Sequence, residues 1–271
     1  MKFAICNEIF QGWKLEDAMA FAKNTGYNAI EIAPFTVARY VNEVSQEKRM
    51  EIRFAAETLG LNISGIHWVL AHTEGFHLTH PEEAVRQRTA KYLVDLVDFC
   101  ADIGGEFMVV GSPKQRDILP GVMKEGAWQF ARNVFRDAVT RAGERNVTIC
   151  LEPLAPQETN FINTAEEAVR FTNQFNSQHF KLVLDVKAMS SEIRSVPRII
   201  KETWPNFAYF HANDVNLKGP GFGKVDFKPI ATALSKVGYS GYVSVEVFNF
   251  EDGPEVIATK SLETLKKAFG V

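Results

Sequence analysis

Four residues able to bind a metal ion stand at the ends of four successive apolar segments in the second half of the chain. The segments are 147–152, 181–185, 207–211 and 242–246, and they end in Glu152, Asp185, His211 and Glu246. A short apolar run that stops at polar residues is typical of a buried strand whose last side chain reaches the edge of a sheet. Three carboxylates and one imidazole suit Mn²⁺, Mg²⁺ or Co²⁺, with Zn²⁺ less favoured. The pattern therefore predicts one divalent-metal centre.

Each of these residues, taken alone, could equally well cap a helix or form an ion pair. Their repetition after four apolar runs favours a common site. Three carboxylates that converged without a cation would repel one another, and some would have to stay protonated.

The rest of the chain alternates between strand and helix. Strands are expected at 3–8, 29–32, 62–67 and 107–110, and helices at about 14–24, 46–59, 82–102, 124–142, from 164, 191–203, 227–237 and 255–269. Gly60 follows the second helix as a C-terminal cap, and Thr164 with Glu167 forms a capping box. Eight strand and helix pairs without a linker predict an α/β fold, a single (β/α)₈ TIM barrel domain over residues 1–271. A doubly wound open sheet is the alternative, although segment 8–12 lacks its glycine-rich first turn.

In such a barrel the C-terminal ends of the strands form the active-site mouth, so the four candidate ligands would share it. Strands about 4.8 Å apart and tilted about 36° place the Cα atoms of strands five and eight roughly 14 Å apart. The carboxylates of Glu152 and Glu246 would then approach to about 4 to 5 Å, which leaves space for a divalent ion.

Composition and charge favour a protein that acts on small molecules. Hydrophobic residues make up 46% of the chain, and the net charge of -3 with a pI near 6.1 gives no broad basic surface. We therefore expect neither nucleic acid nor a membrane as a partner. Cys6, Cys100 and Cys150 each lie in an apolar pattern, which predicts buried free thiols in a reducing compartment. We find no signal peptide and expect a cytoplasmic protein, and a homo-oligomer is compatible with the sequence.

These residues resemble those of the xylose isomerase-like barrel superfamily, which includes sugar phosphate isomerases and epimerases. The resemblance covers essentially the whole chain. It is most specific in Leu151-Glu152-Pro153, Leu184-Asp185, His211–Asp214, Gly219–Asp226 and Ser244–Glu246. The ketose 3-epimerases, such as those acting on tagatose or psicose, are the best described relatives.

The resemblance implies a role for each matching residue. Glu152, Asp185, His211 and Glu246 would bind one divalent metal, and Glu152 and Glu246 would also exchange protons with a sugar substrate. Glu158 matches a residue that commonly contacts substrate hydroxyls.

Metal chemistry of this kind allows three reactions. Chelation of a carbonyl and its adjacent hydroxyl acidifies the neighbouring C–H and stabilises the enediolate that forms. Return of the proton on the opposite face gives epimerisation, and return to the neighbouring carbon gives aldose–ketose isomerisation. A dehydratase would instead expel a β-hydroxyl. We therefore expect a metal-dependent sugar isomerase or epimerase, with a sugar or inositol dehydratase as the alternative.

Two departures from the ketose 3-epimerases concern the substrate. Those enzymes carry a His and an Arg where this chain has Ala188 and Leu217. Lys187 and Lys218 stand one residue away, and we expect both to bind substrate. For Lys187 the alternative is a place between strand and helix, paired with a helix carboxylate. Lys218 is the stronger candidate because it precedes a Gly-Pro-Gly loop that a ligand can approach closely. A lysine suits a keto, hydroxyl or carboxylate group, so we expect a keto-sugar derivative in preference to a plain ketohexose.

The endonuclease IV-type DNA repair enzymes share the scaffold but use three zinc ions. They need a His at position 188 and an Asp-x-His motif where this chain has Asp226-Phe227-Lys228. The missing ligands and the acidic pI count against this function. A non-catalytic sugar-binding barrel would not need the pair of glutamates.

Segment 67–80 holds four of the six histidines. His67 and Trp68, at a strand end, are expected to line a sugar pocket. His72, His77 and His80 are expected to be solvated loop residues rather than a zinc cluster.

Each of three further features is compatible with two roles. Glu8 and Glu31 could bind substrate hydroxyls or form salt bridges in the mouth. Segment 111–116, with Lys114 and Arg116, could bind an anion or form a solvated loop, and the solvated loop is favoured.

Overall fold

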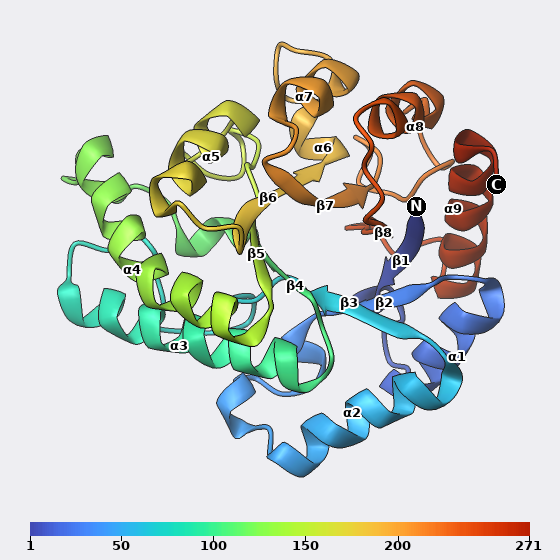
Figure 1. Ribbon diagram of the computed structural model, residues 1–271, viewed down its shortest axis with the longest axis horizontal. Coiled ribbons are helices and arrows are strands. Elements are labelled where there is room, and N and C mark those ends of the chain that lie inside the picture. The colour runs from blue at the N-terminus through green and yellow to red at the C-terminus, as the bar shows by residue number, and fades with distance from the viewer.

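The computed structural model describes residues 1–271, and its centre is a closed barrel of eight parallel strands (Figure 1). Each strand pairs with the next one along the chain, and β8 pairs with β1 to close the sheet. The strands are β1 Lys2–Cys6, β2 Ala29–Ile32, β3 Asn62–Ile66, β4 Phe107–Val110, β5 Thr148–Leu151, β6 Phe180–Asp185, β7 Phe207–Ala212 and β8 Tyr242–Val245. The predicted (β/α)₈ barrel is confirmed, and the open doubly wound sheet is excluded.

The helices surround the barrel in chain order (Figure 1). They are α1 Leu15–Thr25, α2 Gln46–Leu59, α3 Glu83–Asp102, α4 Lys124–Arg145, α5 Ala165–Thr172, α6 Val186–Met189, α7 Val196–Thr203, α8 Phe227–Lys236 and α9 Pro254–Phe269. Their apolar faces and the strands share one cluster of 66 buried residues. Burial of this layer drives the helices onto the sheet.

The interior of the barrel is filled by side chains. Seven buried residues, one from each strand except β3, pack against one another as a separate cluster. They are Ala4, Ala29, Val109, Cys150, Val183, Tyr209 and Tyr242. Because the interior is a packed core rather than a pore, a ligand must bind at the rim of the barrel.

The helix caps follow the sequence signals. Gly60 ends α2 in the left-handed conformation with φ of 62°, as the predicted C-terminal cap requires. Thr164 Oγ1 accepts a hydrogen bond from the Glu167 N–H at 3.2 Å. The Glu167 carboxylate accepts from the N–H of Asn163, one residue before the expected Thr164. These two bonds cap the first turn of α5.

Two predicted boundaries are wrong. The first strand ends at Cys6 instead of residue 8, because Asn7–Ile9 form a 3₁₀ turn. The helix expected at 191–203 begins only at residue 196, as α7, and the short α6 precedes it. The Asp185 side chain caps α6 by accepting from the Ala188 N–H, and Pro197 opens α7.

The cysteines behave as predicted. Cys6, Cys100 and Cys150 are buried and free, and burial raises the pKa of each thiol. None of the helices has the length and apolar character needed to span a bilayer.

Candidate metal centre and active site

The barrel brings the four predicted ligands together at one end of the strands. Glu152 and Glu246 directly follow β5 and β8, Asp185 ends β6, and His211 lies in β7. Asp185 and His211 are direct register partners. One ligand atom from each of the four residues lies within 4.8 Å of the others, and all four residues are buried. This separation is close to the value expected from barrel geometry.

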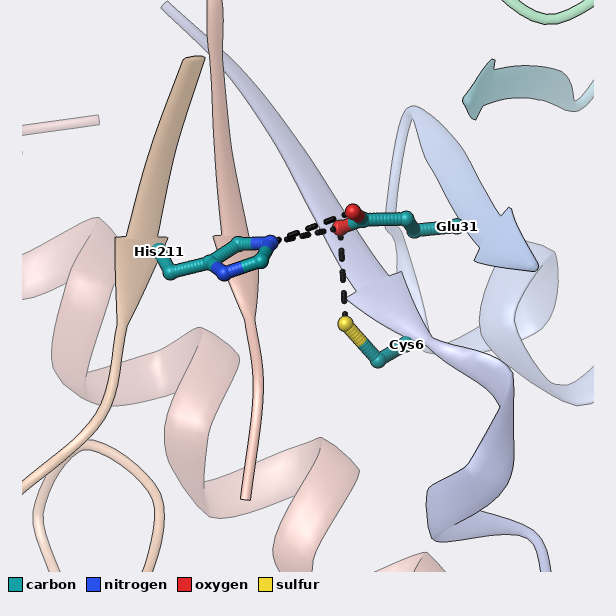
Figure 2. Close-up of side chains that lie close together, drawn as sticks. All are labelled: Cys6, Glu31 and His211. Atoms are coloured by element: carbon teal, nitrogen blue, oxygen red, sulfur yellow. Dashed lines mark hydrogen bonds and ion pairs between the residues drawn. The ribbon is translucent and has the colours of Figure 1, made fainter. Parts of the chain in front are cut away.

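Two atoms of this cluster are buried without a hydrogen-bond partner. His211 Nε2 lies 3.1 Å from both carboxylate oxygens of Glu31, which orients the ring (Figure 2). His211 Nδ1 therefore faces the other carboxylates and lies 3.1 Å from Oε2 of Glu246. Nδ1 and Oε2 form an ion pair with each other, and neither has any other polar partner in the protein. Buried polar atoms are normally paired, so this arrangement fits a shared cation between them.

The charges in the cluster also fit a cation. Burial raises the pKa of Glu152, and the nearby Glu246 and Asp185 raise it further. Burial and Glu246 likewise raise the pKa of Asp185. Burial lowers the pKa of His211, but Glu31 and Glu246 outweigh it and raise that pKa well above its usual value. A divalent ion would displace these protons, and the hard oxygen and imidazole donors suit Mn²⁺, Mg²⁺ or Co²⁺.

Neighbouring groups hold the carboxylates in place. The Asn213 amide donates to Oδ2 of Asp185, and the Ala188 N–H donates to Oδ1 at 2.7 Å. The Trp68 indole N–H donates to Oε1 of Glu246 at 2.8 Å. Oε2 of Glu246 thus stays free to face His211. Such supporting bonds fix the direction in which a ligand side chain points.

Arg116 supports Glu152 from inside the protein. Its guanidinium is fully buried and donates only to backbone carbonyls, namely those of Glu152 at 2.6 Å, Gly111 at 3.1 Å and Ile162 at 3.2 Å. A Cβ at position 111 would lie 2.2 Å from Oε2 of Glu152, so any larger residue there would displace that carboxylate. The expected solvated loop is therefore wrong for Arg116. The side chain turns inward because it supplies the donors that these carbonyls need.

A chain of contacts runs beside the ligands from Trp68 to Glu158. The Trp68 and Phe248 rings stack at 5.9 Å, and Lys187 Nζ lies 4.1 Å from the centroid of Phe248. Lys187 Nζ also pairs with Oε1 of Glu158 at 2.7 Å. Lys187 interacts with the charges of Asp185 and Glu152 as well, which helps to keep its pKa raised although burial lowers it. The structure thus groups three of the predicted substrate-binding residues.

Lys218 is engaged elsewhere. Its Nζ pairs with Asp252 at 2.7 Å and lies 3.9 Å from Glu251, and its side chain is 25% exposed. Its predicted role in substrate binding therefore needs the lysine to leave Asp252.

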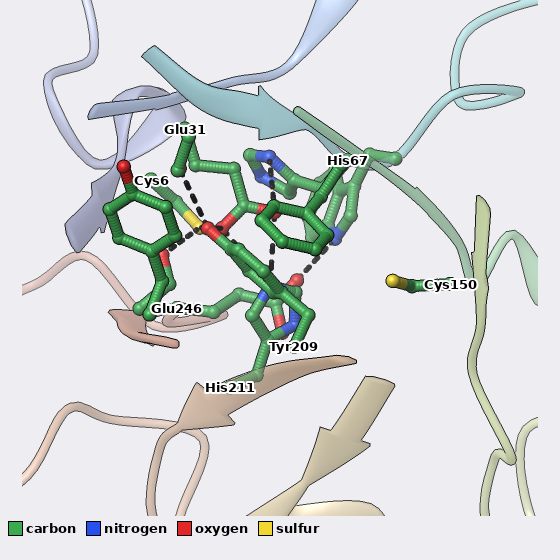
Figure 3. A network of polar contacts seen from close by, with 12 residues as sticks. Cys6, Glu31, His67, Cys150, Tyr209, His211 and Glu246 are labelled. Atoms are coloured by element: carbon green, nitrogen blue, oxygen red, sulfur yellow. Dashed lines mark hydrogen bonds and ion pairs between the residues drawn. The ribbon is translucent and has the colours of Figure 1, made fainter. Parts of the chain in front are cut away.

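His67 and Glu31 belong to a buried polar network (Figure 3). His67 Nε2 lies 2.8 Å from Oε2 of Glu8, and both residues are buried. Glu31 accepts from Tyr209 Oη at 3.0 Å and from the Cys6 thiol at 3.4 Å, in addition to its contact with His211. Of the two roles considered for Glu31, the structure supports the ion pair, because its side chain is only 1% exposed.

The histidines of the β3–α3 connection differ from expectation at one position. His72 is exposed and His80 is half-buried, but His77 is buried. His77 Nδ1 accepts from the Thr79 N–H at 3.3 Å, and the His77 N–H donates to Thr89 Oγ1. This ring packs into the turn instead of facing solvent.

Residues 19–268 match the model of the family described as xylose isomerase-like TIM barrel. The chain belongs to this family. The D-psicose 3-epimerase of Ruminiclostridium cellulolyticum is 28% identical over 228 residues, which cover 82% of this chain and 74% of that protein. The 3-dehydro-D-guloside 4-epimerase of Escherichia coli is 21% identical over 252 residues, which cover 91% of this chain and 92% of that protein.

The fold comparison agrees with the family. The crystal structure of the D-psicose 3-epimerase of Clostridium cellulolyticum H10 with D-tagatose matches with a TM-score of 0.88 at 21% identity, over 99% of both chains. The sequence relatives are epimerases, which are isomerases, so the predicted enzyme class and the superfamily are both confirmed.

Sequence reasoning missed the supporting role of Asn213 and the partners of Glu31 and Arg116. Asn213 lies in the His211–Asp214 segment, and its place two residues after a ligand was the available signal. Glu31 follows apolar residues of a strand, as the four ligands do. Its partner, however, is His211 on β7, which is distant in the sequence. Nothing in the sequence around Arg116 indicates that it is buried, because its acceptors include backbone carbonyls from two other segments.

Proposed function

We propose that the protein is a divalent-metal-dependent sugar epimerase or isomerase that acts on a monosaccharide or keto-sugar derivative. The observation that carries this proposal is the buried cluster of Glu152, Asp185, His211 and Glu246, in which one atom of each lies within 4.8 Å of the others. The relatives support it, since their names describe epimerases of ketoses and of a dehydro-guloside.

Glu152 and Glu246 act as the acid and base. A bound divalent ion would polarise the substrate carbonyl and make the neighbouring C–H more acidic. One glutamate removes that proton to leave an enediolate, and the other delivers a proton to the opposite face of the same carbon, which gives the epimer. Trp68 keeps the Glu246 carboxylate aimed at the site through Oε1.

The remaining predicted residues are assigned to substrate binding. Lys187 and Glu158 form an ion pair beside the ligands, and both can exchange it for substrate hydroxyl or keto groups. Trp68 lies beside Glu246, where the edge of its indole ring can contact the sugar. His67 contributes through Glu8, and Lys218 would reach the substrate by exchanging its pair with Asp252 for a substrate oxygen.

Solvent-deuterium exchange tests the proposal. The Mn²⁺-loaded protein is incubated in D₂O with D-fructose, D-psicose and methyl 3-keto-D-glucoside, and the products are examined by NMR. We expect metal-dependent deuterium uptake next to the carbonyl of at least one sugar, with formation of its epimer. Elimination of water without epimer would point to the dehydratase, and no exchange with any sugar would contradict the proposed reaction.

Two substitutions test the acid and base. Glu152→Gln and Glu246→Gln should each lower kcat by about 10²-fold or more while the protein stays folded, because each removes a proton acceptor. Glu106→Gln, at an exposed carboxylate before β4, is the matched control. Near-normal kcat in either active-site variant would refute the assignment.

A further inference from the structure

A cavity of about 380 Å³ lies between the β1–α1 connection and the loops after β2, β3 and β8. Its walls include five aromatic side chains, which are Phe10, Trp13, Phe35, Trp68 and Phe250. The exposed residues Gln11 and Gly12 form part of its rim. Ligand pockets commonly have volumes of about 300 to 1,000 Å³ and apolar, aromatic walls with a few polar groups. The cavity therefore has the size and lining of a ligand site.

The cavity shares a wall with the metal centre. Trp68 lines the cavity, and its indole N–H donates to Glu246 at 2.8 Å. The Trp68 ring is stacked between Phe35 at 6.0 Å and Phe248 at 5.9 Å. Trp68 also has a φ of 50°, which is uncommon for a bulky residue and is typical of functional positions. Trp68 is thus the side chain that lies next to both the cavity and the metal ligands.

One buried polar group lines this cavity without a full set of partners. Glu8 is 4% exposed, and its Oε2 pairs with His67 Nε2 at 2.8 Å. Its Oε1 is buried and has no hydrogen-bond partner in the protein. A buried carboxylate oxygen is costly unless it accepts a hydrogen bond, so Glu8 would gain a missing partner if a ligand hydroxyl reached it from the cavity.

The lining also excludes one class of ligand. It contains a carboxylate and no lysine or arginine. Glu8 already pairs with His67, and no permanently charged basic side chain of the lining remains to bind a phosphate or carboxylate. Aromatic faces and a hydroxyl acceptor instead suit the apolar ring face and hydroxyls of a neutral sugar.

We propose that this cavity binds a second, neutral glycosyl unit that is attached to the sugar at the metal centre. The inference rests on the proposed function, because it assumes that a sugar lies at the four ligands. The substrate would then be a glycosylated sugar rather than a free hexose or a sugar phosphate. Glu8 would accept a hydrogen bond from a hydroxyl of the second unit.

Binding to three probes with a common fructose unit tests this inference. Isomaltulose carries a neutral glucosyl group on O6, lactulose carries a galactosyl group on O4, and fructose 6-phosphate carries an anion on O6. Affinities are measured by calorimetry with the Mn²⁺-loaded protein. We expect isomaltulose or lactulose to bind at least about tenfold more tightly than D-fructose, as a ring contact and one hydrogen bond allow. Fructose 6-phosphate should bind no more tightly than D-fructose.

A cavity-filling variant supplies the second arm. Leu15 lines the cavity, and Leu15→Trp should remove the advantage of the disaccharide. Leu59→Trp, at the C-terminal end of α2, is the matched control and should retain it. The inference is overturned if neither disaccharide binds more tightly than D-fructose, if Leu15→Trp keeps the advantage, or if fructose 6-phosphate binds best. Deuterium exchange of the sugars reports on the proposed reaction separately, so failure of the reaction and failure of the second binding site can be told apart.

Discussion

Nε2 of His211 on β7 lies 3.1 Å from both carboxylate oxygens of Glu31 on β2 (Figure 2). This contact spans the interior of the barrel and sets which ring nitrogen is free. When Nε2 carries the ring proton and donates a hydrogen bond to Glu31, Nδ1 presents its lone pair toward the other ligands. Carboxylates that bind a ligand histidine in this way orient the ring and make it a better donor.

We therefore predict that Glu31→Gln weakens metal binding. The variant keeps the size of the side chain but loses the charge, and Mn²⁺ affinity should fall by about 10- to 100-fold. Isothermal titration of the metal-free protein measures this, and circular dichroism checks the fold. Glu51→Gln, on the exposed surface of α2, is the control. Unchanged affinity in Glu31→Gln would show that Glu31 does not tune His211.

Arg116 should contribute strongly to the free energy of unfolding, because it binds the backbone around Glu152. Arg116→Lys keeps the charge but loses the fork that reaches three carbonyls. Leaving buried acceptors unpaired should lower the free energy of unfolding by about 2 to 4 kcal/mol. Urea denaturation measures the change against Arg132→Lys, an exposed position on α4 that should change it by less than about 0.5 kcal/mol. Equal stability of the two variants would contradict the inward role of Arg116.

Asp102 predicts a pH dependence of stability. Burial raises the pKa of Asp102, but hydrogen bonds from Arg145 at 2.6 Å and Arg49 at 2.8 Å outweigh it and lower that pKa. The folded-state pKa of Asp102 is thus below its unfolded value of about 3.9, so ionised Asp102 stabilises the protein above that pH. This stabilisation is lost as the pH falls through the folded-state pKa. Asp102→Asn should therefore destabilise the protein at pH 7, and its difference from the parent should shrink as the pH falls below about 4.

Thermal unfolding between pH 3 and pH 7 measures this difference. Asp137→Asn removes an aspartate that is 62% exposed and paired with Arg136. That control should differ little from the parent at any pH, because surface ion pairs contribute little. A difference for Asp102→Asn that stays constant with pH would contradict the charge-based account.

The two lysines give a prediction about substrate affinity. Lys187→Met and Lys218→Met should each raise KM by about tenfold, the value of one charge-assisted hydrogen bond. Steady-state kinetics with the sugar that shows exchange measures the effect, and Lys201→Met on α7 is the control. If Lys218→Met leaves KM unchanged, the lysine serves only its pair with Asp252.

The parts of the site that follow from strand order could be predicted from sequence. Glu152, Asp185, His211 and Glu246 each end an apolar run, and a closed parallel barrel must bring such ends to one rim. Once eight strand and helix pairs are recognised, no further information is needed to place these four together.

The parts that depend on contacts across the barrel could not be predicted. The partner of Glu31 lies 180 residues later in the chain, and no local pattern links the two. Lys218 shows the same limit, because its pairing with Asp252 depends on how the loops after β7 and β8 fold together. Short-range signals such as the Thr164 capping box succeeded because their partners are three or four residues away.

Stoichiometric metal binding tests the central claim most directly. The metal-free protein is titrated with Mn²⁺ and the free ion is followed by electron paramagnetic resonance, for the parent and for Asp185→Asn and His211→Gln. We predict about one tightly bound Mn²⁺ per chain in the parent and a loss of affinity of about 100-fold or more in each variant, since each removes a ligand. A parent that binds no Mn²⁺, or variants that bind it as tightly as the parent, would contradict a metal centre at the four strand ends.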